Sequence, residues 1–221
     1  MVLGFSLMLI NFSEEYLYGC VIITLHGLQY LVDSMQERTL VLIKPEGVYR
    51  AIVGRIITTF ENAGLKVVGL KMVRPNEEMA GKHYAADENW MRGIGMKMKA
   101  SYKEKGIDVQ DEEVEIGRKV RNQLLKHLTS GPVVAMALEG NDAIFVTRKL
   151  VGTTEPRRAD PSSIRGMYAS DSYSMADSKK RPIKNVVHAS DEPETAEKEI
   201  SLWFKPEELS DYKRADEDMF F

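Results

Sequence analysis

The chain has 221 residues, of which 43% are hydrophobic, and its formal net charge is −3. A chain of this length can bury a sizeable core as one domain, and its charge gives no reason to expect a general nucleic-acid binder. Cys20 is the single cysteine, so a disulfide within the chain is excluded, and we expect a reducing, cytoplasmic compartment.

Residues 1–34 differ in composition from the rest of the chain. They open with an apolar run, pass through Glu14 and Glu15, and turn apolar again from Val21 to Leu25. The first run is too short to span a bilayer. The segment lacks both the basic start and the small-residue cleavage site of a signal peptide. We expect an extension outside the fold and no membrane association. The alternative is a membrane-surface anchor, which the missing basic residues and amphipathic face disfavour.

Apolar patterns predict the first elements of the domain. Residues 39–43 form a continuous apolar run with β-branched ends, typical of a buried strand, and Lys44 follows where Pro-Glu-Gly ends that run. Apolar residues at helical spacing predict a helix over 52–60, with Gly64 as its stop. A second strand is predicted over 65–73.

A helix beginning at Asn76, a good N-cap residue, is predicted to reach Tyr84. The stretch 87–117 contains a further predicted helix, because apolar residues recur at spacings of three and four over 91–102. Gly106 is expected to end it. We interpret this added helix as a packing or interface element.

The middle of the chain alternates between strong and ambiguous patterns. An apolar stripe predicts a helix over 116–128, an apolar run predicts a strand over 133–138, and a turn is expected at 139–142. Propensity alone favours a strand over 142–150. Residues 152–184 are long, polar and rich in arginine, and a loop of this length in a compact domain is usually functional.

The last predicted strand and helix hold the strongest candidate for catalysis. A short apolar run ends in His188, and a turn follows in which Ser190 or Asp191 can cap a helix with Pro193 in its first turn. Glu199 lies far along that helix, so a fold-back could bring its carboxylate to the imidazole. A histidine held by a carboxylate is how a nucleophile or base is positioned. The alternative is a histidine that merely caps a turn.

Four blocks of sequence occur in a fixed order: E-R-T-L-V-L-I-K-P-E-G-V at 37–48, S-G-P-V-V-A-M at 130–136, G-T-T-E-P…S-I-R-G at 152–166, and N-V-V-H-A-S-D with T-A-E-K-E-I-S-L-W-F at 185–204. Together they resemble the nucleoside diphosphate kinase family, and four ordered blocks are more specific than one short motif. The resemblance indicates one catalytic domain over 35–212, with an inserted helical segment at 88–117 and a tail at 213–221.

The resemblance implies a ferredoxin-like sandwich of the α/β (α+β) class, in which helices cover a four-stranded antiparallel sheet. It assigns residues 142–150 to a helix, with Asn141 as cap and Gly152 as stop. It also implies a homo-oligomer, a hexamer or a tetramer built from dimers.

The implied activity is Mg²⁺-dependent ping-pong transfer of the γ-phosphate of a nucleoside triphosphate, typically ATP, to a nucleoside diphosphate, which supports CTP, GTP and UTP synthesis. A phosphohistidine on His188 is the implied intermediate. Free histidine has a pKa of about 6.5 and is largely neutral at cytoplasmic pH, so it can attack phosphorus without first losing a proton. Mg²⁺ is expected mainly on the nucleotide phosphates and not in a protein metal site. The expected partners are nucleotides, with no nucleic acid and no membrane.

The resemblance also names site residues. The catalytic set is His188, Glu199, Lys44 and Tyr84, with Glu199 holding one ring N–H. The nucleotide-binding set is Lys44, Val120, Arg148, Thr154, Arg165 and Asn185. The chain has no G-x-x-x-x-G-K-[ST] motif and no complete G-x-G-x-x-G, so side chains must hold the phosphates. Arginine suits this work because its planar fork binds phosphate oxygens bidentately.

Two positions depart from the family pattern. Val120 stands where many members have a phenylalanine against the base, so we expect little base selectivity. Met167 stands where an aspartate often follows the glycine. The rival hypothesis is a silent nucleotide-binding scaffold, whose signature would be loss of the histidine, the lysine or the arginines. The chain keeps all of them.

Overall fold

The computed structural model describes residues 36–84, 86–104 and 106–216, and the predicted extension over 1–34 lies outside this part of the chain. The described residues from Glu37 onward belong to one compact unit. Its sheet has the strand order β2-β3-β1-β4, with β2 antiparallel to β3 and β1 antiparallel to β4. The strands are β1 (Gln36–Ile43), β2 (Lys66–Val73), β3 (Val133–Asn141) and β4 (Val187–Ala189). This sheet confirms the predicted ferredoxin-like α+β class.

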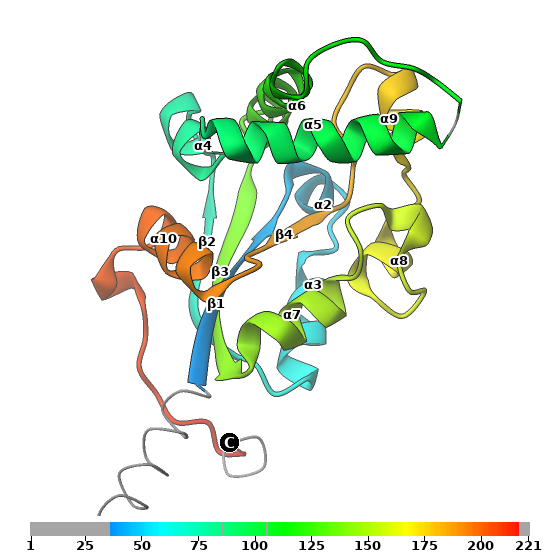
Figure 1. The fold of residues 1–221 in the computed structure, drawn as a ribbon. Helices are drawn as coiled ribbons and strands as arrows, with labels where there is room; N and C mark the ends of the chain where they lie inside the picture. The colour runs from blue at the N-terminus through cyan, green and yellow to red at the C-terminus, as the bar shows by residue number, and fades with distance from the viewer. Residues whose placement is uncertain (1–35, 85, 105, 217–221) are drawn as a thin grey trace, which may run out of the picture. The chain divides into compact units, whose positions relative to one another are not determined.

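Helices lie on both sides of the sheet (Figure 1). In chain order they are α2 (Pro45–Tyr49), α3 (Val53–Asn62), α4 (Glu77–His83), α5 (Glu88–Lys103), α6 (Glu113–Leu128), α7 (Ala143–Val151), η1 (Pro156–Arg158), α8 (Ile164–Tyr168), α9 (Tyr173–Ser178), α10 (Pro193–Trp203) and η2 (Pro206–Glu208). The helices predicted over 52–60, 76–84, 91–102 and 116–128 are therefore confirmed, with small shifts at their ends.

The alternation of side chains along β1 divides the core into two layers. Val41 and Ile43 face a cluster that α3, α7 and α8 complete. Leu40 and Leu42 face a second cluster, which α4, α6 and α10 cover. All four side chains are fully buried, which explains the continuous apolar run in the sequence. The second layer is the one that receives the candidate catalytic groups.

The inserted helix α5 packs very closely against α6. A Cβ atom on Gly95 would lie 1.9 Å from the carbonyl oxygen of Glu113, and one on Gly117 would lie 2.0 Å from that of Met91. Glycine at both positions therefore lets the two backbones touch. Past the far end of α5, Glu104 lies 3.6 Å from Arg158. Figure 1 shows α5 running from α4 toward α9 across the top of the sheet.

The predicted turn at 139–142 is wrong, because β3 continues to Asn141. Glu139 pairs with Lys66 in the ladder, which keeps this stretch in the sheet. Asn141 is consequently not the cap of α7. Asp142 takes that position with φ 47°, and the carboxylate of Glu37 accepts the Ile144 N–H at 3.1 Å. Residues 143–151 form a helix as the resemblance implied, and propensity alone was misleading there.

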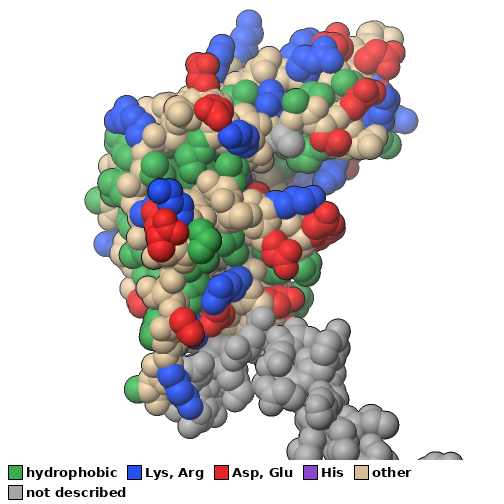
Figure 2. Space-filling model, turned by 90° about the vertical axis from the view of Figure 1, so that its left-hand side faces the viewer, with side chains coloured by type: hydrophobic (Ala, Val, Ile, Leu, Met, Phe, Trp, Pro, Cys, Tyr) green, Lys and Arg blue, Asp and Glu red, His purple; other side chains and the backbone are tan. Residues whose placement is uncertain are grey.

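The long polar segment after Gly152 is not one loop, since it contains η1, α8 and α9. Each of these helices is three to six residues long, too short to show a clear apolar period in the sequence. Within the described residues, none of the helices has the length and apolar character needed to cross a membrane. Figure 2 shows that the upper part, where Figure 1 places α5 and α6, projects over the body and leaves a hollow beneath it.

Candidate active site

The pairing of β4 with β1 determines on which face of the sheet His188 lies. His188 lies directly opposite Leu42, so its side chain points into the layer covered by α4 and α10. Lys44 is two residues beyond Leu42 and follows the same alternation. The sheet therefore directs the histidine and the lysine to one side.

His188 is held by Glu199 on α10. Its Nε2 lies 2.9 Å from each carboxylate oxygen, so Nε2 carries the proton and Nδ1 keeps its lone pair. Burial alone would raise the pKa of Glu199, but His188, His83 and Ser190 outweigh it and keep that pKa below its usual value. Glu199 is therefore an anion at neutral pH. The His188 side chain stays 23% exposed, which leaves it open to a substrate.

Ser190 completes this pair, and its role was missed in the sequence. Its hydroxyl donates to Glu199 at 2.5 Å and accepts the Leu40 N–H at 3.3 Å. Neither Ser190 nor Asp191 caps α10, which begins with Glu192 as N-cap and Pro193 at its first position. The Ser-Asp-x-Pro pattern resembles a helix start, and this local signal concealed a fully buried serine that orients the carboxylate.

His83 is a second histidine that sequence reasoning did not single out. Its ring meets the His188 ring edge to face, with 4.6 Å between centroids. Burial lowers the pKa of His83 to about 3, with His188 and Lys44 adding to the effect and Glu199 opposing it. Trp203 donates its indole N–H to Nδ1 at 3.3 Å, so the neutral ring carries its proton on Nε2. The 3.5 Å approach of Nδ1 to Glu199 is consequently not an ion pair.

His83, His188 and Glu199 bring three potential metal-ligand atoms within 4.8 Å of one another. Each of these residues already has a hydrogen bond, from Trp203 to His83 and between His188 and Glu199. A metal ion would have to displace these contacts.

Lys44 and Asn185 form the second part of the site. The Lys44 ammonium donates to Oδ1 of Asn185 at 2.6 Å, and Nδ2 of Asn185 donates to the Thr154 carbonyl at 3.0 Å. Burial lowers the pKa of Lys44 to about 8, Glu46 opposes this, and Arg165 adds to it. The structure thus brings three of the predicted nucleotide-binding residues into one hydrogen-bonded chain.

Arg165 on α8 supplies a guanidinium beside this chain. It donates to the carbonyls of Gly152 at 2.8 Å and Val187 at 2.9 Å, while its Nε is buried without a hydrogen-bond partner. Burial lowers the pKa of Arg165 to about 10, and the nearby Arg148 adds to this. Two arginines and a lysine that repel one another form a site that an anion would stabilise.

Tyr84 and Val120 are the remaining predicted site residues. Tyr84 follows α4, is buried, and lies 4.7 Å from the His83 ring. Burial raises the pKa of Tyr84, and the negative charges of Glu199 and Glu46 add to this effect. Val120 is half-buried on α6 next to Arg121, which donates to the Tyr84 carbonyl at 2.7 Å. Its contact with a base stays a prediction.

An antiparallel α+β sandwich that presents a carboxylate-held histidine to a lysine and two arginines belongs to the phosphotransferases. A profile of the nucleoside diphosphate kinase family matches residues 37–92 and 94–209. The nucleoside diphosphate kinase of Pyrobaculum aerophilum is 47% identical over 178 residues, covering 78% of this chain and 97% of the relative. That of Pyrococcus abyssi is 40% identical over 191 residues, covering 86% and 98%.

Solved structures agree with these sequence matches. An NDP kinase from Pyrobaculum aerophilum superposes with a TM-score of 0.77 at 44% identity, covering 80% of this chain and all of that one. A transition-state mimic of the Borrelia burgdorferi enzyme with vanadate and ADP has a TM-score of 0.69 at 34% identity, covering 85% and 98%. The chain belongs to the nucleoside diphosphate kinase family, whose members require a divalent metal ion.

Proposed function

We propose that the chain moves the γ-phosphoryl group of a nucleoside triphosphate, typically ATP, to a nucleoside diphosphate through a phosphohistidine on Nδ1 of His188. The observation that carries this proposal is the bond from Nε2 of His188 to Glu199 at 2.9 Å. It fixes the tautomer whose second nitrogen is nucleophilic, on the side of the sheet where Lys44 and Arg165 gather positive charge.

In the first half-reaction, Nδ1 of His188 attacks the γ-phosphorus in line. A nitrogen–phosphorus bond forms, the bond from γ-phosphorus to the bridging oxygen breaks, and the nucleoside diphosphate leaves with that electron pair. The ring gains positive charge, which anionic Glu199 balances through the Nε2 proton. In the second half-reaction another nucleoside diphosphate attacks the phosphohistidine, and the nitrogen–phosphorus bond breaks. One anhydride replaces another, so the net reaction is close to balanced.

Lys44, Arg148 and Arg165 would hold the phosphate oxygens, with Thr154 beside them. Lys44 and Asn185 would grip the ribose hydroxyls, and Tyr84 would donate a hydrogen bond within the site. The buried, unpartnered Nε of Arg165 supports an anion at this position. Glu46 and Glu199 are both paired with histidines, so the donor set suits phosphates rather than a bare cation. Mg²⁺ held by those phosphates would lower their charge as the phosphoryl group transfers.

Val120 would cover the base with less stacking energy than an aromatic ring, so purine and pyrimidine nucleotides should both be accepted. A hundredfold preference for one base in kcat/KM would contradict this. We further propose a cytoplasmic homo-oligomer, a hexamer or a tetramer built from dimers, whose size light scattering would measure.

We place the catalytic domain at 35–212, with residues 1–34 outside it. Fractionation of the full chain beside a chain starting at Met35 would test this boundary. We expect the two chains to have equal activity and to remain equally in the fraction that contains no membranes. Membrane association of the full chain alone would favour a surface anchor.

The proposed reaction is tested by incubating the full chain with γ-labelled ATP and Mg²⁺ beside a His188→Ala variant. Wild type should take up acid-labile, base-stable label, and a different nucleoside diphosphate should release it. Equal labelling of both proteins, or labelling of neither, would show that His188 is not the nucleophile. The nucleotide-binding scaffold would then become the better reading.

A further inference from the structure

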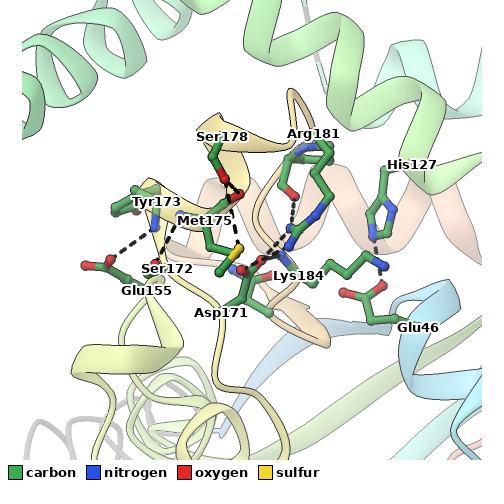
Figure 3. Close-up of polar contacts among 12 residues, drawn as sticks. Glu46, His127, Glu155, Asp171, Ser172, Tyr173, Met175, Ser178, Arg181 and Lys184 are labelled. Atoms are coloured by element: carbon green, nitrogen blue, oxygen red, sulfur yellow. Dashed lines mark hydrogen bonds and ion pairs between the residues drawn. The ribbon is translucent and has the colours of Figure 1, made fainter.

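A second histidine–carboxylate pair lies next to the site but takes no part in the proposed reaction. Nε2 of His127 on α6 is 2.8 Å from Oε2 of Glu46 on α2, and the two side chains are 14% and 11% exposed. Figure 3 shows them pointing toward each other from these two helices. His127 lies on α6, the helix that also carries Val120. Glu46 comes two residues after Lys44, which follows β1. The pair therefore connects the helix proposed to cover the base with the segment proposed to bind phosphate.

The other oxygen of Glu46 holds a strained turn. Oε1 accepts the Val186 N–H at 3.1 Å, and the Val186 carbonyl accepts the Lys44 N–H at 2.8 Å. Val186 has φ 68°, and the Val187 N–H closes a three-residue turn onto the Asn185 carbonyl at 2.7 Å. A β-branched residue with positive φ is costly, and such residues persist only where surrounding contacts fix them.

The strained turn connects both parts of the candidate site. Asn185 on one side of Val186 binds the Lys44 ammonium, and His188 lies two residues beyond on the other side. The segment before the turn is fixed separately, because Asp171 binds Arg181 at 2.5 and 3.1 Å and the Lys184 N–H at 2.7 Å. Figure 3 shows these contacts beside the His127–Glu46 pair. Among the described contacts, Glu46 supplies the side-chain acceptor for the turn itself.

Glu46 also sets the charge around Lys44. Burial would raise the pKa of Glu46, but His127 and Lys44 lower it to about 2, so it remains ionised. The carboxylate also helps, after Asp171, to hold the pKa of Arg181 above its usual value. Lys44 is itself faced by Glu46, Arg165 and His83, and of these Glu46 alone is an anion. A neutral side chain at position 46 would leave Lys44 with the Arg165 guanidinium and the neutral His83 ring, and without the anion that opposes them.

We propose that Glu46, anchored by His127, is a positioning residue for phosphoryl transfer: it fixes the Asn185–Val186 turn and neutralises the surroundings of Lys44 before nucleotide binds. This inference rests on the proposed roles of Lys44 and Asn185 in holding nucleotide. It assigns Glu46 no contact with the transferring phosphoryl group. Its loss should therefore weaken nucleotide binding more than the chemical step.

The direct test replaces the carboxylate with an amide of the same size. Glu46→Gln keeps an acceptor for the Val186 N–H but removes the charge beside Lys44. At pH 7.5 with Mg²⁺ we expect KM for ATP and for a nucleoside diphosphate to rise about tenfold, with kcat within about threefold of wild type. The rise of KM at alkaline pH should begin at a lower pH. Glu194→Gln, the same change at an exposed position of α10, is the matched control and should alter neither constant.

His127 provides a test outside the nucleotide contacts. His127→Phe keeps a ring but removes the donor to Glu46, and His127→Gln places an amide N–H near the position of Nε2. We expect His127→Phe to raise KM about threefold to fivefold and His127→Gln to stay within about twofold of wild type. If the pair had only a structural role, His127→Phe would lower thermal stability, but KM would not differ between His127→Phe and His127→Gln.

The outcomes separate this inference from the proposed function. If wild type takes no label on His188, the proposed function fails, and the positioning role fails with it. If wild type is labelled while Glu46→Gln and His127→Phe keep the wild-type KM, and KM begins to rise at the same alkaline pH as in wild type, the positioning role alone fails. Should Glu46→Gln not fold by circular dichroism, the two His127 variants decide, and equal KM values for them would overturn the proposal.

Discussion

Two histidine–glutamate pairs lie in this molecule at almost the same distance and depth. Nε2 of His188 is 2.9 Å from Glu199, and Nε2 of His127 is 2.8 Å from Glu46. Both carboxylates are 11% exposed, and the histidines are 23% and 14% exposed. The distance and burial of each pair therefore do not distinguish a nucleophilic histidine from a histidine that only positions other groups.

The two pairs differ in the other groups with which each carboxylate interacts, besides its histidine. Glu199 receives a second hydrogen bond from the Ser190 hydroxyl, so both of its partners orient it toward one ring. Glu46 instead accepts a backbone N–H, and its negative charge acts on Lys44 and Arg181. The first pair is built to direct an imidazole, and the second is built to hold a turn and a cation. The same substitution made in each pair should therefore have different effects on kcat and KM.

The largest contrast comes from the same substitution in both histidines. His188→Gln removes the proposed nucleophile and should reduce kcat by at least about 10⁴-fold, because no phosphohistidine can form. His127→Gln keeps a donor for Glu46 and should reduce kcat by less than about threefold. Steady-state kinetics and acid-labile labelling of both variants measure this. Comparable losses in the two would mean that the pairs share one role.

The matching change in the carboxylates should separate kcat from KM. Glu199→Gln still accepts the Nε2 proton but loses the charge that balances the ring during transfer, so kcat should fall roughly 10²-fold. Its KM should change less than that of Glu46→Gln. Single-turnover formation of phosphohistidine isolates the affected step. A Glu199→Gln variant with wild-type phosphorylation rate would contradict the proposed electrostatic role.

The sequence was sufficient for one of these pairs and not for the other. His188, Glu199 and Lys44 stand in blocks with the spacing of a strand, a turn and a helix, so local pattern and family resemblance singled them out, and the His188–Glu199 contact is present. Their catalytic roles stay predictions. Glu46 and His127 lie in different helices, and their contact depends on how α2 and α6 come together in the fold. Ser190 was mistaken for a helix cap because a serine before proline satisfies that local rule equally well.

The same distinction applies to the fold. Long periodic segments such as α3 and α6 were predicted well, because burial of one face repeats every few residues. Residues 142–150 were ambiguous because Ile144, Phe145 and Val146 favour a strand by propensity, yet packing made a helix. The strained φ of Val186 had no signal in the sequence, since valine rarely adopts it and the contacts that hold it come from distant segments.

Lys44 gives a prediction in which pH sharpens the comparison. Its pKa of about 8 in the free protein means that it loses its proton above that pH, whereas a bound phosphate should raise the pKa and keep it charged. Nucleotide affinity should therefore fall as pH rises through 8, by up to about tenfold per pH unit, with proton uptake on binding. Calorimetry at pH 8.5 in buffers of different ionisation enthalpy measures that uptake.

Lys44→Met is the control for this titration. It should bind nucleotide more weakly and take up no proton at pH 8.5. Glu46→Gln should shift the fall in affinity to lower pH, since it removes the anion that supports the ammonium. A wild-type affinity that is constant between pH 7 and 9.5 would exclude Lys44 as the titrating group.

Ser190→Ala should produce a smaller effect confined to the catalytic pair. It removes a hydrogen bond to the buried Glu199 and the acceptor of the Leu40 N–H, which should lower the free energy of unfolding by about 1–3 kcal/mol. Activity should fall only severalfold, because Glu199 still binds His188 directly. Urea unfolding and kcat measure the two effects. Ser190→Thr, which keeps the hydroxyl, should recover more of the activity than of the stability, since an added methyl group at a fully buried position tends to overpack the core.

The smallest effect is expected from an ion pair that matches the two histidine pairs in distance alone. Lys198 lies 2.8 Å from Glu194 on the surface of α10, with side chains 73% and 79% exposed. Water screens both charges before and after unfolding, and two long side chains must be ordered to meet, so such pairs add little. Lys198→Met should leave the urea midpoint, KM and kcat unchanged. A clear loss of stability here would mean that contact distance, and not burial and the neighbouring groups, determines what these pairs contribute. The comparison of His188–Glu199 with His127–Glu46 would then lose its physical basis.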